Sequence, residues 1–304
     1  MDFMKRFTKR FLSLLLCLIL GGSVCGSAVA ACSGDLTGDN KIGTADARNI
    51  LRAAVGLDQL NAAAKQAADM NLDGAVTTAD ARLALRVAVG LEVTDGKLYT
   101  NEYDVLRSGF FFADFAVKDA SGEQTMVLAV AGDASYLSME FTDEELMQEF
   151  GMDAIRIDLL FEGKTAYLLD KTNRLYAEFP FEAMEMDPSE VESMSEAKDM
   201  FSKYPALDQA ASKATAAFNG VTCTVYTFNY TDGSSLEVFM NGAKVMGIVE
   251  HNAKGEAATT YTFNTVTLTV PKEYISIPAA YTEGDAMEML LLLFFGGLME
   301  ELDL

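Results

Sequence analysis

The chain has 304 residues, a formal net charge of −22 and a hydrophobic fraction of 50%. Its length allows one large domain or two smaller ones, and its apolar content excludes an intrinsically disordered chain. The acidic excess would repel nucleic acid and anionic lipid at long range, so we expect no nucleic-acid partner. It suits an exported protein, a cation-binding protein or a protein whose partner has a basic surface.

The first 30 residues have the layout of a secretory signal peptide. Four cations precede an apolar run from Phe11 to Leu20, and small residues lead to Ala28-Val29-Ala30. The run is too short for a membrane span, which needs about 20 apolar residues. We therefore predict export with cleavage after Ala30, and no transmembrane segment. Cleavage removes four cations and one anion, which changes the net charge from −22 to −25.

Two cysteines, Cys32 and Cys223, would remain after cleavage, which is too few for a disulfide framework. Cys223 lies on the valine face of a strand-like run and is expected to be a buried free thiol. Val29-Ala30-Ala31-Cys32 resembles a bacterial lipobox, whose cysteine would become lipidated. Two localisations therefore stay open: a secreted protein cleaved after Ala30, or a cell-surface protein anchored through Cys32.

One segment of the chain occurs twice, 34 residues apart. "GDLTGDNKIGTADARNILRAAVGL" covers residues 34–57 and "ADMNLDGAVTTADARLALRVAVGL" covers residues 68–91, and 11 of 14 positions are identical between 44–57 and 78–91. Each copy opens with a twelve-residue loop that has side-chain oxygens at positions 1, 3, 5 and 12 and a backbone carbonyl at position 7. Ca²⁺ prefers six to eight such oxygen ligands. We predict two calcium sites, with the ligands Asp35, Thr37, Asp39, Lys41 and Asp46 in the first copy and Asp69, Asn71, Asp73, Ala75 and Asp80 in the second.

Position 6 of such a loop needs a left-handed backbone conformation. Gly74 adopts this conformation freely, and Asn40 is among the few other residues that tolerate it. At position 8, Ile42 and Val76 are the small apolar residues that pack such loops together.

A loop with aspartate at position 12, followed by one helix and given twice, resembles the type I dockerin module. The resemblance covers residues 33–92, about a fifth of the chain. Thr37 and Asn40 depart from the asparagine and glycine usual in the family, so we expect the second site to bind calcium more tightly. The resemblance implies docking to a cohesin module of a cellulosome-like extracellular scaffold. It also implies the cohesin-contact positions Thr44, Ala45, Leu51 and Arg52, with Thr78, Ala79, Leu85 and Arg86 in the second copy.

Helical spacing supports a docking surface independently. Arg52 lies four residues after Arg48, and Arg86 lies four residues after Arg82, so each predicted helix has a ridge of two arginines. A solvated face is the other interpretation, but in so acidic a chain the arginines favour an acidic cohesin rim. The residues predicted to pack the two repeats together are Ile50, Ala54 and Val55.

After a polar joint at 92–96, the sequence is mostly typical of short strands. The strand candidates are Ser108–Val117, Gln124–Ala131, Ala154–Phe161, Thr165–Asp170 and Arg174–Glu178. Four further runs between 221 and 268 alternate with turns, among them Asn241-Gly242, and predict an antiparallel meander. Helices are predicted at Asp143–Phe150, Pro188–Phe218 and Ala286–Met299. The fold class is therefore α+β, with a small helical module followed by an antiparallel β-rich domain over residues 98–304.

The predicted closing helix, Ala286–Met299, has two interpretations. Burial against the sheet is favoured, and a partner-binding or lipid-touching segment is the alternative. Two stretches, "GKTAYLLDKTNRLYAEFP" and "VTLTVPKEYISIPAAY", resemble lipoprotein-carrier half-barrels. That resemblance implies an open sheet curled over an apolar cavity, and hence an apolar small-molecule or lipid ligand, although an ordinary core explains the same residues.

Catalytic residues are not evident in the sequence. The single histidine, His251, is predicted to lie solvated in a surface turn, and no H-E-x-x-H motif or phosphate-binding glycine loop occurs. The sequence favours a calcium-dependent dockerin joined to a non-catalytic binding or structural domain. The alternative is a dockerin-borne glycoside hydrolase or other polysaccharide-degrading enzyme, whose paired carboxylates would be hidden among 45 acidic residues.

Overall fold

The computed structural model describes residues 33–301, except residues 121, 142–154, 164 and 181–198. The predicted signal peptide, Cys32 and the predicted helix Asp143–Phe150 lie outside the described residues. The helices are α2 (Thr44–Ala54), α3 (Ala62–Ala68), α4 (Thr78–Ala88), α5 (Glu102–Arg107) and α8 (Ala286–Glu301), with 3₁₀ turns η2 (Leu207–Gln209) and η3 (Lys272–Tyr274). The strands are β1 (Glu92–Val93), β2 (Phe110–Asp119), β3 (Gly122–Ala131), β4 (Ala134–Phe141), β5 (Ile155–Glu162), β6 (Thr165–Asp170), β7 (Leu175–Glu178), β8 (Ser212–Phe218), β9 (Val221–Asn229), β10 (Ser235–Asn241), β11 (Lys244–His251), β12 (Ala257–Thr267), β13 (Val270–Pro271) and β14 (Thr282–Glu283).

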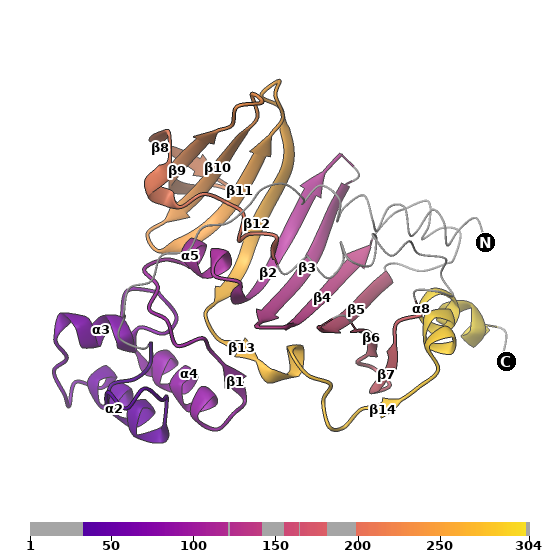
Figure 1. Cartoon of the computed structure of the whole chain (residues 1–304), viewed down its shortest axis with the longest axis horizontal. Helices are drawn as coiled ribbons and strands as arrows, with labels where there is room; N and C mark the ends of the chain where they lie inside the picture. Colours follow the sequence, from indigo (N-terminus) through magenta and orange to yellow (C-terminus); the bar gives the residue numbers. More distant parts are fainter. Residues whose placement is uncertain (1–32, 121, 142–154, 164, 181–198, 302–304) are drawn as a thin grey trace.

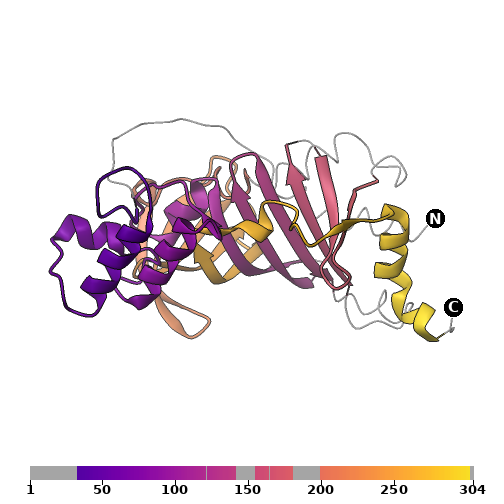
Figure 2. The ribbon, with the colours of Figure 1, turned by 90° about the horizontal axis from the view of Figure 1, so that it is seen from below.

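The molecule is α+β, as predicted. Helices α2, α3 and α4 precede one large sheet in the chain and lie to one side of it (Figure 1). Helices α2 and α4 pack against each other around the fully buried Ile50 and Ala84 and form a small separate core. The large sheet has the strand order β14-β7-β6-β5-β4-β3-β2-β12-β11-β10-β9-β8. Every neighbouring pair is antiparallel except β14 and β7. The helical module and α8 lie at opposite ends of the molecule (Figure 2).

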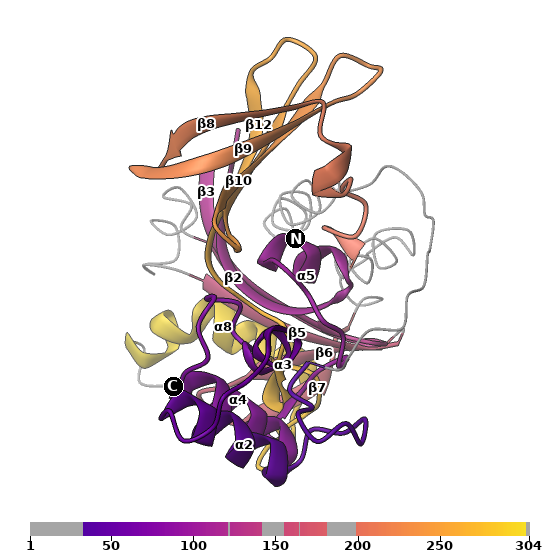
Figure 3. The same ribbon diagram turned by 90° about the vertical axis from the view of Figure 1, so that its left-hand side faces the viewer.

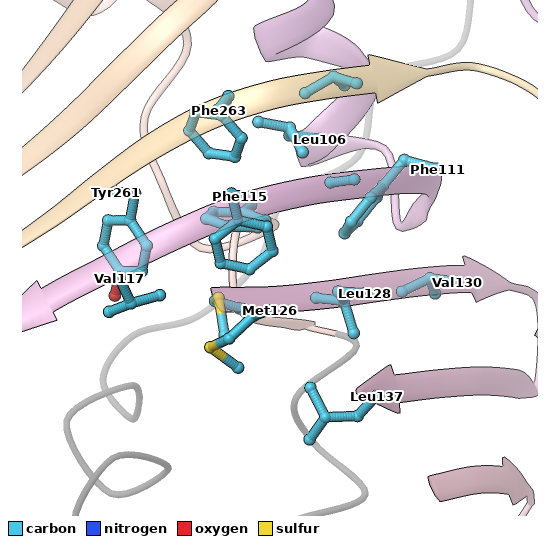
Figure 4. Packing of buried hydrophobic residues seen from close by; sticks show 14 of the residues in the cluster. Leu106, Phe111, Phe115, Val117, Met126, Leu128, Val130, Leu137, Tyr261 and Phe263 are labelled. Carbon is cyan, nitrogen blue, oxygen red and sulfur yellow. The ribbon is translucent and has the colours of Figure 1, made fainter. Parts of the chain in front are cut away.

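Alternation along β2 divides its aromatic side chains between the two faces of the sheet. Phe111 and Phe115 are fully buried on one face, within the main hydrophobic core (Figure 4). Phe110 and Phe112 belong to the opposite face, where the ring of Phe112 lies 5.1 Å from the ring of Tyr274. The segment that follows β13 therefore covers the outer face, while the inner face holds the main core.

The inner face is filled at its centre by Phe201, which precedes the 3₁₀ turn η2. Its side chain is fully buried, and its ring centroid lies within 6.0 Å of five other aromatic rings. These rings belong to Phe111, Phe115, Tyr204, Tyr261 and Phe263. Tilted and edge-on ring pairs of this kind are characteristic of a close-packed core.

Helix α5 lies on the concave side of the curved sheet (Figure 3). It forms hydrogen bonds with the β10–β11 turn and with the segment around Pro205. Glu102 Oε2 accepts a hydrogen bond from Val245 N at 3.0 Å, and Glu102 N donates to the carbonyl of Ala243 at 2.8 Å. The Tyr103 hydroxyl donates to the carbonyl of Pro205 at 2.9 Å. This short helix thus joins the β10–β11 turn to the segment that contains Phe201.

The helical prediction for Pro188–Phe218 is wrong over all of its described residues, 199–218. Residues 199–211 form turns and the 3₁₀ turn η2, and residues 188–198 lie outside the described part of the chain. Ser212–Phe218 forms the edge strand β8, which pairs with β9 from Ser212 opposite Thr227 to Phe218 opposite Val221. Three of the seven residues of β8 are alanine and one is lysine, so local propensity favours a helix. Backbone pairing with β9 outweighs that weak preference.

His251 is not a solvated turn residue, contrary to the sequence-based prediction. It is the last residue of β11, it is partly buried, and its Nε2 lies 3.1 Å from Glu237 Oε2 on β10. Cys223 is a buried free thiol on β9, as predicted. Within the described part of the chain, no helix has both the length and the apolar character needed to cross a membrane.

Backbone hydrogen bonds tie the helical module to the joint that follows it and to the sheet domain. β1 pairs with β13, the backbone N–H of Lys272 donates to Leu91 O at 3.0 Å, and the N–H of Ser33 donates to Gly96 O at 2.8 Å. The polar joint predicted at 92–96 therefore includes a paired strand and not only a free linker.

We predict that Glu102 makes the stability of the sheet domain depend on pH. Burial raises the pKa of Glu102 to about 7, although the Val245 hydrogen bond and the charge of Lys244 oppose the rise. The folded state therefore favours the neutral acid. Its stabilising contribution is complete below pH 4.5, the ordinary pKa, and is lost as the pH rises through 7.

Thermal unfolding at about pH 5 and pH 8 should show a loss of up to about 3 kcal/mol in the wild type. Glu102→Gln should flatten this dependence, because the amide oxygen can still accept from Val245 N without ionising. The exposed Glu123→Gln is the matched control and should leave the dependence intact. An unchanged pH dependence in Glu102→Gln would assign it to other groups.

Candidate metal centre and docking helices

The two predicted calcium loops follow the same backbone path. Position 4 has a left-handed conformation in both, with φ of 76° at Gly38 and 56° at Leu72. Position 6 is also left-handed, with φ of 62° at Asn40 and 85° at Gly74. Asn40 thus takes the conformation for which glycine is usual, and the substitution does not alter the loop.

The aspartates at position 12 tie each loop to the helix that follows it. Asp46 Oδ1 accepts from the N–H groups of Leu36 and Thr37 at 3.0 and 2.8 Å, and its Oδ2 accepts from Gly43 N at 2.8 Å. Asp80 repeats this pattern with the N–H groups of Met70, Asn71 and Thr77 at 2.9, 3.1 and 2.8 Å. Both carboxylates are buried, so each brings a negative charge from the first helical turn into the loop.

The aspartates at position 1 differ in their electrostatics. Burial raises the pKa of Asp35, but hydrogen bonds from the N–H groups of Gly38 and Asn40 outweigh it and leave the pKa below its usual value. Burial raises the pKa of Asp69, and repulsion from Asp80 and Asp73 adds to the rise, which the hydrogen bonds from the N–H groups of Gly74 and Asp73 offset only in part. A bound cation would relieve this repulsion.

The first loop brings three carboxylates together. One oxygen each of Asp35, Asp39 and Asp46 lie within 4.8 Å of one another, and this is the one such acidic group among the described residues. At position 3, Thr37 Oγ1 lies 3.3 Å from Asp35 Oδ1, and in the second loop Asn71 Nδ2 lies 2.9 Å from Asp73 Oδ2. The position-7 residues, Lys41 and Ala75, each donate their N–H to the aspartate at position 5, at 2.9 and 2.8 Å.

This donor set fits a hard divalent cation. Every predicted side-chain ligand offers oxygen, and the backbone N–H groups already hold the carboxylates in place. A cation of this type would be held by oxygens of Asp35, Asp39 and Asp46 in the first loop. Their counterparts Asp69, Asp73 and Asp80 would serve in the second loop, although they do not form so close a group there.

Each helix after a loop ends in the same way. Gly56 and Gly90 are left-handed, with φ of 77° and 73°. The N–H of Leu57 donates to Arg52 O at 2.8 Å, and the N–H of Leu91 donates to Arg86 O at 2.9 Å. This glycine-based helix end folds the following leucine back against the last helical turn.

The result is a matched pair of apolar patches on the surface. Leu51 and Leu85 are 44% and 45% exposed, Val55 and Val89 are both 56% exposed, and Leu57 and Leu91 are 66% and 55% exposed. Val55 therefore does not pack the repeats together, as its position on the helix had suggested, whereas Ile50 does. Val55, Leu57 and their counterparts belong to the apolar patches but were not among the predicted contacts.

The remaining predicted contact positions lie beside these patches. Thr44, Ala45 and Thr78 are exposed, and Ala79 is partly exposed. Arg52 and Arg86 each form an ion pair with an acidic residue six positions later. Arg52 Nε lies 2.7 Å from the exposed Asp58, whereas Arg86 bonds to the buried Glu92.

These features define a duplicated calcium loop–helix module with two equivalent apolar patches. Residues 33–85 match the family model of the Dockerin type I domain. The amino-terminal module is therefore a type I dockerin, as its loops and helices had indicated. Dockerin domains bind calcium and support attachment to a cohesin in cellulosome-type assemblies outside the cell. The match covers less than half of the chain and does not extend to the sheet domain.

Solved structures resemble the chain only weakly. They include an uncharacterized conserved protein from Thermus thermophilus, with 8% identity over 60% of this chain and 96% of that one, at a TM-score of 0.31. A chain of the Pseudomonas aeruginosa MucA/MucB complex matches with 11% identity over 60% of this chain and 61% of its own length, at 0.32. LprF from Mycobacterium bovis matches with 10% identity over 60% and 97%, at 0.31. The presence of MucB and LprF agrees with the weaker resemblance seen in the sequence, but at such TM-scores the matches carry no argument about function. No curated protein matches the chain.

We predict that the dockerin module loses helix when calcium is removed. In the absence of a cation, Asp35, Asp39 and Asp46 repel one another, and the free energy of metal binding is also free energy of folding. Far-ultraviolet circular dichroism of the whole chain with a chelator should show a loss of helical signal that added calcium restores. Identical spectra in both conditions would contradict a calcium-dependent module.

Proposed function

We propose that this protein is exported, binds calcium at both loops and attaches through either helix of its dockerin module to a cohesin of a cellulosome-like scaffold. The observation that supports this best is the matched exposure of Leu51, Val55 and Leu57 with Leu85, Val89 and Leu91. Apolar side chains at equal exposure on both repeats are costly in water and are typical of a surface that a partner covers.

The two copies offer one partner the same surface. The helix-end geometry, the apolar patch and the arginine ion pair recur 34 residues apart. A cohesin that fits α2 should therefore also fit α4 after a half-turn of the module. The exposure of the predicted contact positions does not favour one copy strongly over the other.

Arginine substitutions would be poor probes of this docking. Replacement of Arg52 leaves the exposed Asp58 in water, which costs little. Replacement of Arg86 leaves Glu92 buried without its cation, and Glu92 Oε2 already has no hydrogen-bond partner among the described residues. An Arg86 variant would therefore confuse loss of stability with loss of binding. Leu51 and Leu85 form a better pair, because neither is buried and their exposure is the same.

We predict that Leu51→Glu and Leu85→Glu are each tolerated and that the double variant does not bind. Loss of one of two equivalent modes should weaken cohesin binding only about twofold, while loss of both removes the apolar contact. Titration of immobilised type I cohesin modules with the calcium-loaded chain measures the effect. Met287→Glu, at a similarly exposed position on α8, is the control for a general loss of surface apolarity. If one single variant abolished binding, only that helix would form the interface.

For the sheet domain we infer a non-catalytic binding or structural role. Among the described residues, the packing of the inner face of the sheet around Phe201 supports it. This packing gives an apolar or lipid ligand less support than a structural role. The alternative remains a dockerin-borne polysaccharide hydrolase.

We predict that the whole chain releases no reducing sugar from a panel of plant polysaccharides.

We also predict that an environment-sensitive apolar dye shows no saturable binding to the folded protein, because Phe201 occupies the inner face. Phe201→Ala should admit the dye, since it leaves a cavity in a close-packed core. Sugar release would favour the hydrolase, and saturable wild-type binding displaced by fatty acid would favour a lipid-holding domain.

A further inference from the structure

The second calcium loop is attached to two different cores. Its odd positions bear the predicted side-chain ligands Asp69, Asn71 and Asp73. Positions 2 and 4 between them are buried: Met70 is fully buried in the core of the dockerin module, and Leu72 belongs to the main core of the sheet domain. Among the described residues of the module, Leu72 is the one buried in that cluster. The loop therefore lies between the two cores, with metal ligands on either side of Leu72.

The first loop has no such attachment. Its position 4 is Gly38, which is exposed, and a side chain placed there would contact nothing within 4 Å. Glycine suits the left-handed conformation required at this position, whereas a leucine at φ 56° is strained. A leucine is unfavourable for the loop by itself. Its burial to 8% exposure in the sheet-domain core supplies the compensating interaction.

The surrounding contacts keep the second loop against the sheet domain. Helix α4, which begins directly after this loop, leads through Leu91 into β1, and β1 pairs with β13 of the sheet domain. Ser33, two residues before the first loop, donates its N–H to Gly96 O in the joint, but among the described residues no member of the first loop belongs to the sheet-domain core. The second repeat is thus fastened at both ends, through Leu72 and through β1.

We propose that Leu72 couples the second calcium loop to the folding of the sheet domain. An ion held by Asn71 and Asp73 fixes the backbone that presents Leu72, so calcium at this loop stabilises the sheet domain. By linkage, the folded sheet domain raises the calcium affinity of the second loop by the same factor, while the first loop stays independent. The proposal rests on the calcium-binding function proposed above.

The distribution of aromatic residues makes the coupling measurable in the whole chain. All 11 tyrosines lie at or beyond Tyr99, and the chain has no tryptophan, so the near-ultraviolet tyrosine signal reports the sheet domain and not the dockerin module. Thermal melting followed by this signal should shift upward by several degrees when calcium is added. Asp39→Ala, which weakens the first site, should keep the shift, whereas Asp73→Ala should lose most of it.

Substitutions of Leu72 separate the anchor from the metal site. Asparagine tolerates the left-handed conformation, as Asn40 does in the first loop, so Leu72→Asn preserves the loop but removes the apolar anchor. Calorimetric titration of the whole chain should show about tenfold weaker calcium binding at the second site, and the calcium-induced shift in sheet-domain melting should disappear. Leu72→Met keeps an apolar anchor of similar volume and should retain most of both effects.

The outcomes distinguish the two proposals. If the wild-type chain binds no calcium, the proposed function and the coupling both fail. If calcium binds at two sites but sheet-domain melting does not move, the coupling alone is wrong. Equal loss of the shift in Asp39→Ala and Asp73→Ala, or an undiminished shift in Leu72→Asn, would also refute Leu72 as the link.

Discussion

The buried carboxylates of Asp46 and Asp80 are the constraint on which the dockerin module depends. Each is taken out of water and accepts three backbone hydrogen bonds, two from the loop before it and one from the helix start beside it. Hydrogen bonds of this kind favour the charged form of a buried carboxylate. Each of these two charges lies in a loop with two more aspartates, Asp35 and Asp39 or Asp69 and Asp73, and such a group of oxygens suits a hard cation. The carboxylates thus join each loop to the start of the helix that displays an apolar patch.

The two repeats match in the residues of the proposed docking surface and differ in the residues that hold each repeat in place. The exposed apolar residues and the helix ends match in the two copies, and each copy has an arginine paired with an acidic residue six positions later. Elsewhere the repeats differ: Gly38 and the Asp58 side chain of the first copy face water, whereas Leu72 and Glu92 of the second copy are buried. Selection for the proposed two-way docking surface would constrain only the side that meets the partner. The opposite side of the second copy is free to become part of the neighbouring domain.

The sequence was informative wherever a feature depends on residues close together in the chain. The left-handed Asn40 and the strand turns follow from local spacing and backbone preference, and each lies where the pattern indicated. The spacing of Asp35, Asp39 and Asp46 likewise anticipates the group that these carboxylates form. Features that depend on distant partners could not be read in this way. Ser212–Phe218 looks helical until β9 pairs with it, Val55 looks buried until the helix end is seen, and Leu72 looks like an ordinary loop residue. The aromatic packing around Phe201 likewise depends on strands more than 80 residues before it and about 60 residues after it.

The short ladder between β1 and β13 has a consequence for assembly on a scaffold. A flexible linker would let an attached domain sample many positions whichever helix docked. Here Glu92 and Val93 are paired with Pro271 and Val270, only one residue after the last apolar contact at Leu91. The sheet domain must then turn with the dockerin. Two docking modes related by a half-turn would place it in two discrete orientations on the same cohesin, so that neighbouring copies on a crowded scaffold could alternate sides and avoid collision.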